Sequence, residues 1–231
     1  MYKSTATAKS QGSALDPQQF NLIGVTVGMR QNFLIYLIAG WSGYFVMAME
    51  LLGGRTLTPY FGSGIYVWGA IITLFMLSLS IGYLLGGHFS AQQPSLRKLS
   101  LILWVATLAA LPCATRSTAI LERVFDAIPD PRYGALLASV ALFFLPITIS
   151  GAISPYAIRL LVDGLGSSGQ VAGKVFFIST FGSTAGTLLT SFYLVLLFEL
   201  DQLFYGMMAI SVAVASAGLL LGGEKGTRHD A

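Results

Sequence analysis

Six long apolar runs constrain the fold of this chain more than any other feature of its sequence. A helix needs about 20 mainly apolar residues to cross a bilayer. Only 10% of the residues are charged and the mean hydropathy is +0.73, values that are typical of integral membrane proteins. The sequence therefore predicts an all-α integral membrane protein with six transmembrane helices. The predicted spans are residues 33–52, 65–85, 99–115, 133–161, 175–198 and 203–221.

The segments on either side of these spans are polar. Residues 1–31 are rich in Ser, Thr, Gln and Ala and lack an apolar core close behind the first positive charges, so we do not expect a cleaved signal peptide. We expect a flexible tail at 1–31, a six-helix membrane domain at 32–222 and a second tail at 223–231.

The Lys and Arg residues predict the orientation. With a cytoplasmic N-terminus, nine of the thirteen lie in the inner segments. Because inner loops of membrane proteins are enriched in Lys and Arg, this predicts that both termini are cytoplasmic. The outer segment 116–132 mixes basic and acidic residues and resembles a short amphipathic helix at the outer surface. The alternative is a solvated loop turn with no binding role. The four outer basic residues are Arg55, Arg116, Arg123 and Arg132.

Two charges flank the end of the first apolar run. Glu50 lies near its end, where a carboxylate costs free energy unless it reaches water or a partner. Gly53 and Gly54 follow, and we expect them to form a sharp reversal. Arg55 would then fold back over the helix end, so we predict a direct or water-bridged contact between Glu50 and Arg55 at the outer membrane edge.

Glycines spaced four residues apart occur in two spans. Gly82 and Gly86 lie in the second span, and Gly182 and Gly186 lie in the fifth. This spacing opens a groove on one face of a helix and permits close approach of another backbone. We expect the two pairs to face each other or to dock a partner helix. The alternative is that they reflect only the general abundance of Gly in membrane helices.

A second charged pair is predicted at the inner end of the fourth span. Arg159 and Asp163 are four residues apart, which would bring their side chains together on a helical extension. The alternative role for Arg159 is a membrane anchor that reaches lipid phosphates.

Four separated stretches carry a family resemblance. They are ELLGGRTLTPYFGSGIYVW, LSLSIGYLLGG, LPITISGAISPYAIRLLVD and GQVAGKVFFISTFGSTAGTLLTSF. In this order they resemble the membrane portion of bacterial spermidine synthase-like proteins, also described as fused major-facilitator/spermidine synthase proteins. The resemblance covers roughly residues 33–222. It implies one six-helix half of a major facilitator transporter, built from two inverted three-helix repeats, in the bacterial inner (cytoplasmic) membrane.

Enzymatic activity is not expected. Members of that family commonly carry a soluble aminopropyltransferase domain after the membrane half, whereas ten residues follow Leu221 here, without a Gly-rich nucleotide-binding loop. Cys113 is the only cysteine and the two histidines are isolated, so no metal site, catalytic residues or cofactor is predicted. The basic residues are scattered singly, which does not favour nucleic-acid binding.

Two functions remain. The first is a non-catalytic membrane subunit or anchor that packs in the lipid bilayer against other membrane proteins or a second copy of itself. The alternative is a half-transporter for a polyamine or another small cation. A transporter needs ionisable groups inside the membrane, and only Glu50 of ten acids lies close to a span interior. Ala91 and Gln92 also stand where a facilitator carries charged loop residues. We therefore favour the subunit.

Overall fold

The computed structural model describes residues 17–162 and 164–222, and within these residues every regular element is a helix. Six helical segments are long and apolar enough to cross a membrane, which is the number that the sequence predicts. The helices are α1 (Pro17–Phe61), α2 (Ile65–Phe89), α3 (Leu96–Ala109), α4 (Leu111–Thr115), α5 (Ser117–Ala127), α6 (Pro131–Gly151), α7 (Ile153–Leu161), η1 (Leu165–Ser167), α8 (Ser168–Leu189), η2 (Thr190–Leu194), α9 (Val195–Leu197) and α10 (Leu200–Leu221).

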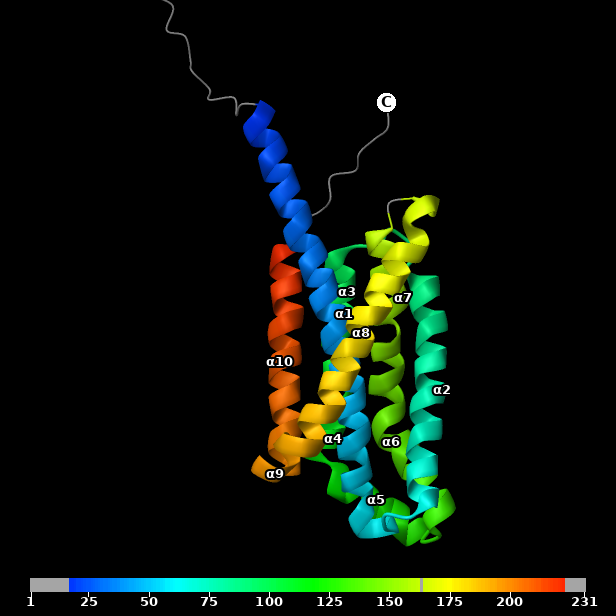
Figure 1. The fold of residues 1–231 in the computed structure, drawn as a ribbon. Helices are drawn as coiled ribbons and strands as arrows, with labels where there is room; N and C mark the ends of the chain where they lie inside the picture. The colour runs from blue at the N-terminus through cyan, green and yellow to red at the C-terminus, as the bar shows by residue number, and fades with distance from the viewer. Residues whose placement is uncertain (1–16, 163, 223–231) are drawn as a thin grey trace, which may run out of the picture.

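Helix α1 is much longer than the first predicted span. Its 45 residues correspond to about 67 Å at about 1.5 Å per residue, roughly twice the thickness of a hydrocarbon core of about 30 Å. Its N-terminal part extends past the other helices in Figure 1. Residues 17–31, which we expected in a flexible tail, are therefore helical.

The predicted reversal at Gly53 and Gly54 is wrong, because α1 continues through both to Phe61. A Cβ atom on Gly53 would lie 3.0 Å from the ring of Phe143, and one on Gly54 would lie 2.6 Å from the ring of Trp68. These glycines therefore make room for aromatic rings. The turn into α2 lies at residues 62–64, where Gly62 adopts a φ of +79°, a conformation that favours glycine.

Prolines break two of the spans. The third span divides between α3 and α4, with Pro112 in the first turn of α4. The fourth divides between α6 and α7, just before Pro155. Proline has no N–H to donate and its ring excludes the carbonyl four residues earlier, here that of Gly151. This break confirms the predicted kink, whereas Pro146 stays within α6.

The predicted amphipathic helix of the outer segment is present as α5, whose Leu121 is buried. After it, Asp130 caps α6: its Oδ1 accepts a hydrogen bond of 2.8 Å from the backbone N–H of Arg132. The Arg132 guanidinium also pairs with Asp130 at 3.2 Å. The hydrogen bond from this side chain holds the pKa of Asp130 below its usual value.

The spans pack as long pairs (Figure 1). Helix α1 lies along α8, α2 along α6, and α3 along α10. Two tryptophans fix α10 to the bundle: Trp41 Nε1 donates to Ser211 Oγ at 2.7 Å, and Trp104 Nε1 donates to Ser216 Oγ at 3.3 Å. Buried side chains of α1 belong to both apolar clusters of the core, so α1 is the central helix.

The two ends of the bundle differ in charge. We call the end where α3 and α8 begin the basic end; its described residues include five cations and no acid. The opposite end, where α5 lies, holds four arginines and five acids among the described residues. The cations of the basic end are Arg30, Arg97, Lys98, Arg159 and Lys174.

Candidate functional site

The glycines of α8 are buried against α1. A Cβ atom on Gly182 would collide with the carbonyl oxygen of Gly40, and one on Gly186 would lie 2.6 Å from the carbonyl oxygen of Tyr44. Between them, Ser183 Oγ donates to the carbonyl of Gly43 at 3.2 Å. This Gly182–Gly186 seam is therefore closed inside the chain by α1.

The glycines of α2 have a different partner. A Cβ atom on Gly82 would collide with the carbonyl oxygen of Thr148 in α6, and one on Gly86 with that of Ala152, at the α6–α7 break. The expectation that the two glycine pairs face each other is therefore wrong. Each pair admits the backbone of a different helix of the same chain, so neither is open to a partner protein.

The predicted direct contact between Glu50 and Arg55 is also absent. The guanidinium of Arg55 donates to the carbonyl oxygen of Val195 in α9 at 3.0 Å. It lines the same surface hollow as Glu199 and Asp201. Because α1 stays helical, side chains five residues apart differ in direction by about 140°. The two charges therefore point to different surroundings.

Glu50 lies inside the first span rather than at its end. The span runs from Gly28 to Phe61, and Glu50 is half-buried eleven residues before its end. Within the described residues, the Glu50 carboxyl has no hydrogen bond or ion pair. Ionisable groups inside membrane spans are costly and often mark substrate or proton pathways.

At the end of the fourth span, Arg159 is exposed in the last turn of α7, which ends at Leu161. Asp163, its predicted partner, lies outside the described residues. The pairing of Arg159 with Asp163 stays a prediction.

The fifth span is held on one side only. Of its most apolar stretch, 11% is buried, against 61% for the span formed by α6 and α7. Four hydroxyl residues lie on the side of this span opposite the Gly182–Gly186 seam. They are spaced at intervals of four, three and four residues, which places them on one helix face. Three are exposed and Thr187 is half-buried. We call this face the hydroxyl stripe: Thr180, Thr184, Thr187 and Ser191.

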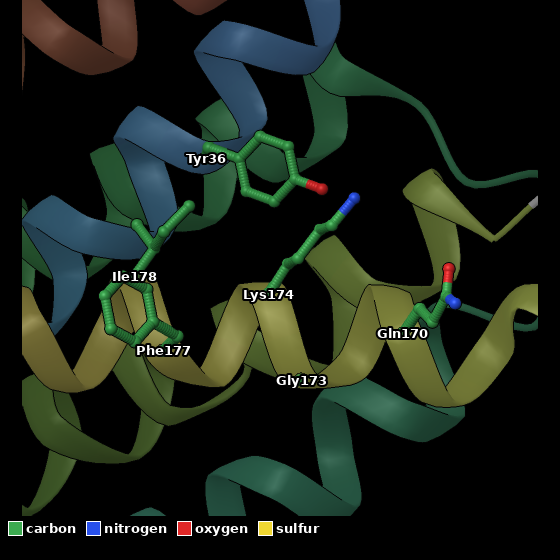
Figure 2. Close-up of a pocket in the computed structure, with 6 residues that line it drawn as sticks. All are labelled: Tyr36, Gln170, Gly173, Lys174, Phe177 and Ile178. Carbon is green, nitrogen blue, oxygen red and sulfur yellow. The ribbon is translucent and has the colours of Figure 1, made fainter.

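The sequence reasoning missed a groove between α1 and α8 near the basic end (Figure 2). Its volume is about 700 Å³. Tyr36 of α1 and Lys174 of α8 direct their polar ends toward the same space. Gln170 and Gly173 form the part nearest the start of α8, and Phe177 and Ile178 form the part toward the membrane interior.

Groups typical of catalysis are sparse. In residues 17–162 and 164–222, no group of three or more His, Cys, Asp or Glu side chains could hold a metal ion. The buried thiol of Cys113 donates to the carbonyl oxygen of Leu142 at 3.3 Å, which is a packing role. The features that could carry a function are therefore Glu50, the hydroxyl stripe and the groove. No protein-family model, curated protein or solved structure matches this chain.

Proposed function

We propose that the protein is a non-catalytic membrane subunit or anchor that packs through the hydroxyl stripe of α8 and η2 against another membrane protein. The stripe is the observation that carries this proposal. Small and hydroxyl side chains are enriched where membrane helices meet, because they allow close backbone approach. The glycine seams are occupied within the chain, so the stripe replaces them as the partner surface.

The stripe suits helix packing because its hydroxyl groups do not depend on hydrogen bonds from a partner. Thr184 Oγ1 donates to the carbonyl of Thr180, and Thr187 Oγ1 to that of Ser183, each at 3.0 Å. Their protons are therefore satisfied within α8, while the small side chains leave a shallow face. The large exposed side chain of Leu188 borders it and would contact the side of a partner helix.

The packing pattern supports the resemblance to half of a major facilitator transporter. The second span uses Gly82 and Gly86 to admit the fourth, and the fifth uses Gly182 and Gly186 to admit the first. Exchanging spans 1–3 with spans 4–6 turns one interface into the other, as expected for two three-helix repeats. The excess of cations at the basic end supports a cytoplasmic location of both termini. The proposed membrane is the bacterial inner membrane, as the family resemblance implies.

Photo-crosslinking in the native membrane tests the partner surface. A benzophenone amino acid replaces Thr184 on the stripe or, as a control, Leu101, which is 54% exposed on α3. We expect a discrete protein adduct from position 184 and none from position 101. Mass spectrometry of the adduct distinguishes a second copy of the chain from a different membrane protein. Only lipid adducts at both positions would refute the proposal.

Glu50 favours the alternative, a half-transporter for a polyamine or small cation. Its carboxyl, which has no partner among the described residues, lies inside α1 and is the type of group that such a pathway requires. Saturable spermidine uptake into proteoliposomes of the pure protein, abolished in Glu50→Gln, would establish transport and displace the subunit as the main function. Equal, unsaturable leak in both proteins would exclude transport by the isolated chain.

A further inference from the structure

The groove between α1 and α8 lies where the apolar part of the fifth span begins. Lys174 is six residues after the start of α8, and the apolar residues that follow include Phe176 and Phe177. In a bilayer this level corresponds to the boundary between headgroups and acyl chains, where long cationic side chains reach toward phosphates. A phospholipid beside α8 would thus have its phosphate at the height of Lys174.

The polar side of the groove suits an anion. Lys174 is exposed and makes no hydrogen bond or ion pair with any described residue, so its ammonium is free to bind. The hydroxyl of Tyr36 is directed to the same space in Figure 2, and Gln170 adds an amide one turn earlier on α8. The described residues of the basic end include no acid that would compete for Lys174.

The other side of the groove is apolar. Phe177, which lines the groove, is 70% exposed, and Phe181, one turn further along α8, is 67% exposed. Their rings stack with centroids 6.3 Å apart, along the side of α8 that runs into the membrane. No described residue has an atom within 4 Å of the position of a Cβ atom on Gly173, so the described part of the chain leaves the groove open at this point. The groove therefore joins a cationic pocket to an aromatic wall that an acyl chain can follow.

We propose that this groove binds one anionic phospholipid of the cytoplasmic leaflet. Lys174 and the Tyr36 hydroxyl donate to the phosphate, Gln170 donates to a headgroup or ester oxygen, and one acyl chain lies along Phe177 and Phe181. The single positive charge matches the single negative charge of a phosphatidylglycerol. This inference is independent of the proposed partner, whose surface is the hydroxyl stripe.

Titration of phosphatidylglycerol into delipidated protein in a neutral detergent tests the site. The thermal unfolding midpoint reports binding, and native mass spectrometry counts the retained lipids. Since one basic residue near a membrane surface contributes a factor of about five in lipid affinity, we expect Lys174→Gln to weaken binding five- to tenfold. Tyr36→Phe should weaken it less. Gly173→Leu should block it by filling the groove, without a clash inside the protein.

Lys98→Gln is the matched control. It removes the same charge at the same end, but the Lys98 ammonium already donates to the carbonyls of Gln92 and Gln93, so binding should be unchanged. Equal weakening by Lys98→Gln and Lys174→Gln would overturn the site in favour of general surface charge. Equal protection by phosphatidylcholine would refute anion selectivity, and equal protection by glycerol phosphate would refute the acyl-chain contact.

Discussion

Gly186→Ala tests whether the α1–α8 seam stabilises the fold. The added Cβ atom would lie 2.6 Å from the carbonyl oxygen of Tyr44, whereas ordinary contacts begin at 3.4 Å. The backbone of α1 must therefore retreat by about 0.8 Å, the difference between these distances. A gap of this size removes about a quarter to a half of the dispersion energy of an atom pair, which is about 0.1–0.2 kcal/mol.

Over roughly 30 atom pairs along the seam, this loss amounts to about 1–3 kcal/mol, which is the usual range for overpacked cores. We expect Gly186→Ala to lower the free energy of unfolding by this amount. Gly87→Ala is the control, because no atom of residues 17–162 or 164–222 lies within 4 Å of the position of its Cβ atom. It should cost nothing, since Ala favours helix over Gly.

The assay is unfolding of the purified variants in mixed micelles with a rising fraction of dodecyl sulfate, followed by tryptophan fluorescence. Circular dichroism checks that each variant starts with the helix content of the wild type. A midpoint for Gly186→Ala equal to that for Gly87→Ala would show that the seam tolerates a side chain, and the reasoning from close backbone approach would fail.

Three further predictions concern individual side chains. Arg55→Gln should cost about 1 kcal/mol and should be additive with Glu50→Gln within about 0.5 kcal/mol in a double-mutant cycle, because the two side chains do not meet; a larger coupling would restore the direct pair. Trp41→Phe should cost about 0.6–1 kcal/mol in the same unfolding assay through loss of the bond to Ser211; an unchanged midpoint would show that this bond contributes no stability. The pKa of Asp130 is lowered in the folded protein, so its ionised carboxylate stabilises the fold at pH values above the unfolded pKa of about 3.9. This contribution is lost as the pH falls through the pKa of the folded state. The thermal midpoint of Asp130→Asn should therefore fall less than that of the wild type between pH 6 and pH 3, whereas equal falls would contradict this linkage.

The number of spans could be predicted from sequence because each apolar run carries its own signal. The end of α1 could not. Gly53 and Gly54 look like a turn in isolation, but α1 continues through them, and the rings of Phe143 and Trp68 occupy the space that larger side chains would fill. Phe143 is remote in sequence and Trp68 lies on the next helix, so no pattern around the two glycines reveals the position of either ring.

The candidate surfaces show a similar limit. Spacing alone identified the close-packing faces at Gly82 and Gly182, but it describes one side of an interface. On the opposing sides, the atoms in contact are the backbone carbonyl oxygens of Thr148 and Gly40. Because every residue has a carbonyl oxygen, these contacts leave no pattern in the sequence. The hydroxyl stripe had a readable signal in its regular spacing. The groove had none, because Tyr36 and Lys174 come from helices far apart along the chain.

The pairing of the first span with the fifth has a consequence for biogenesis. The bond between Ser183 and Gly43 joins residues 140 positions apart. At about 5–20 residues per second, the ribosome needs about 7–28 seconds to make that intervening chain. Throughout this interval α1 is in the bilayer without its main neighbour, and its Gly40–Gly43 surface faces lipid or an insertion factor. The helix that enters the membrane first is thus completed by one of the last to arrive.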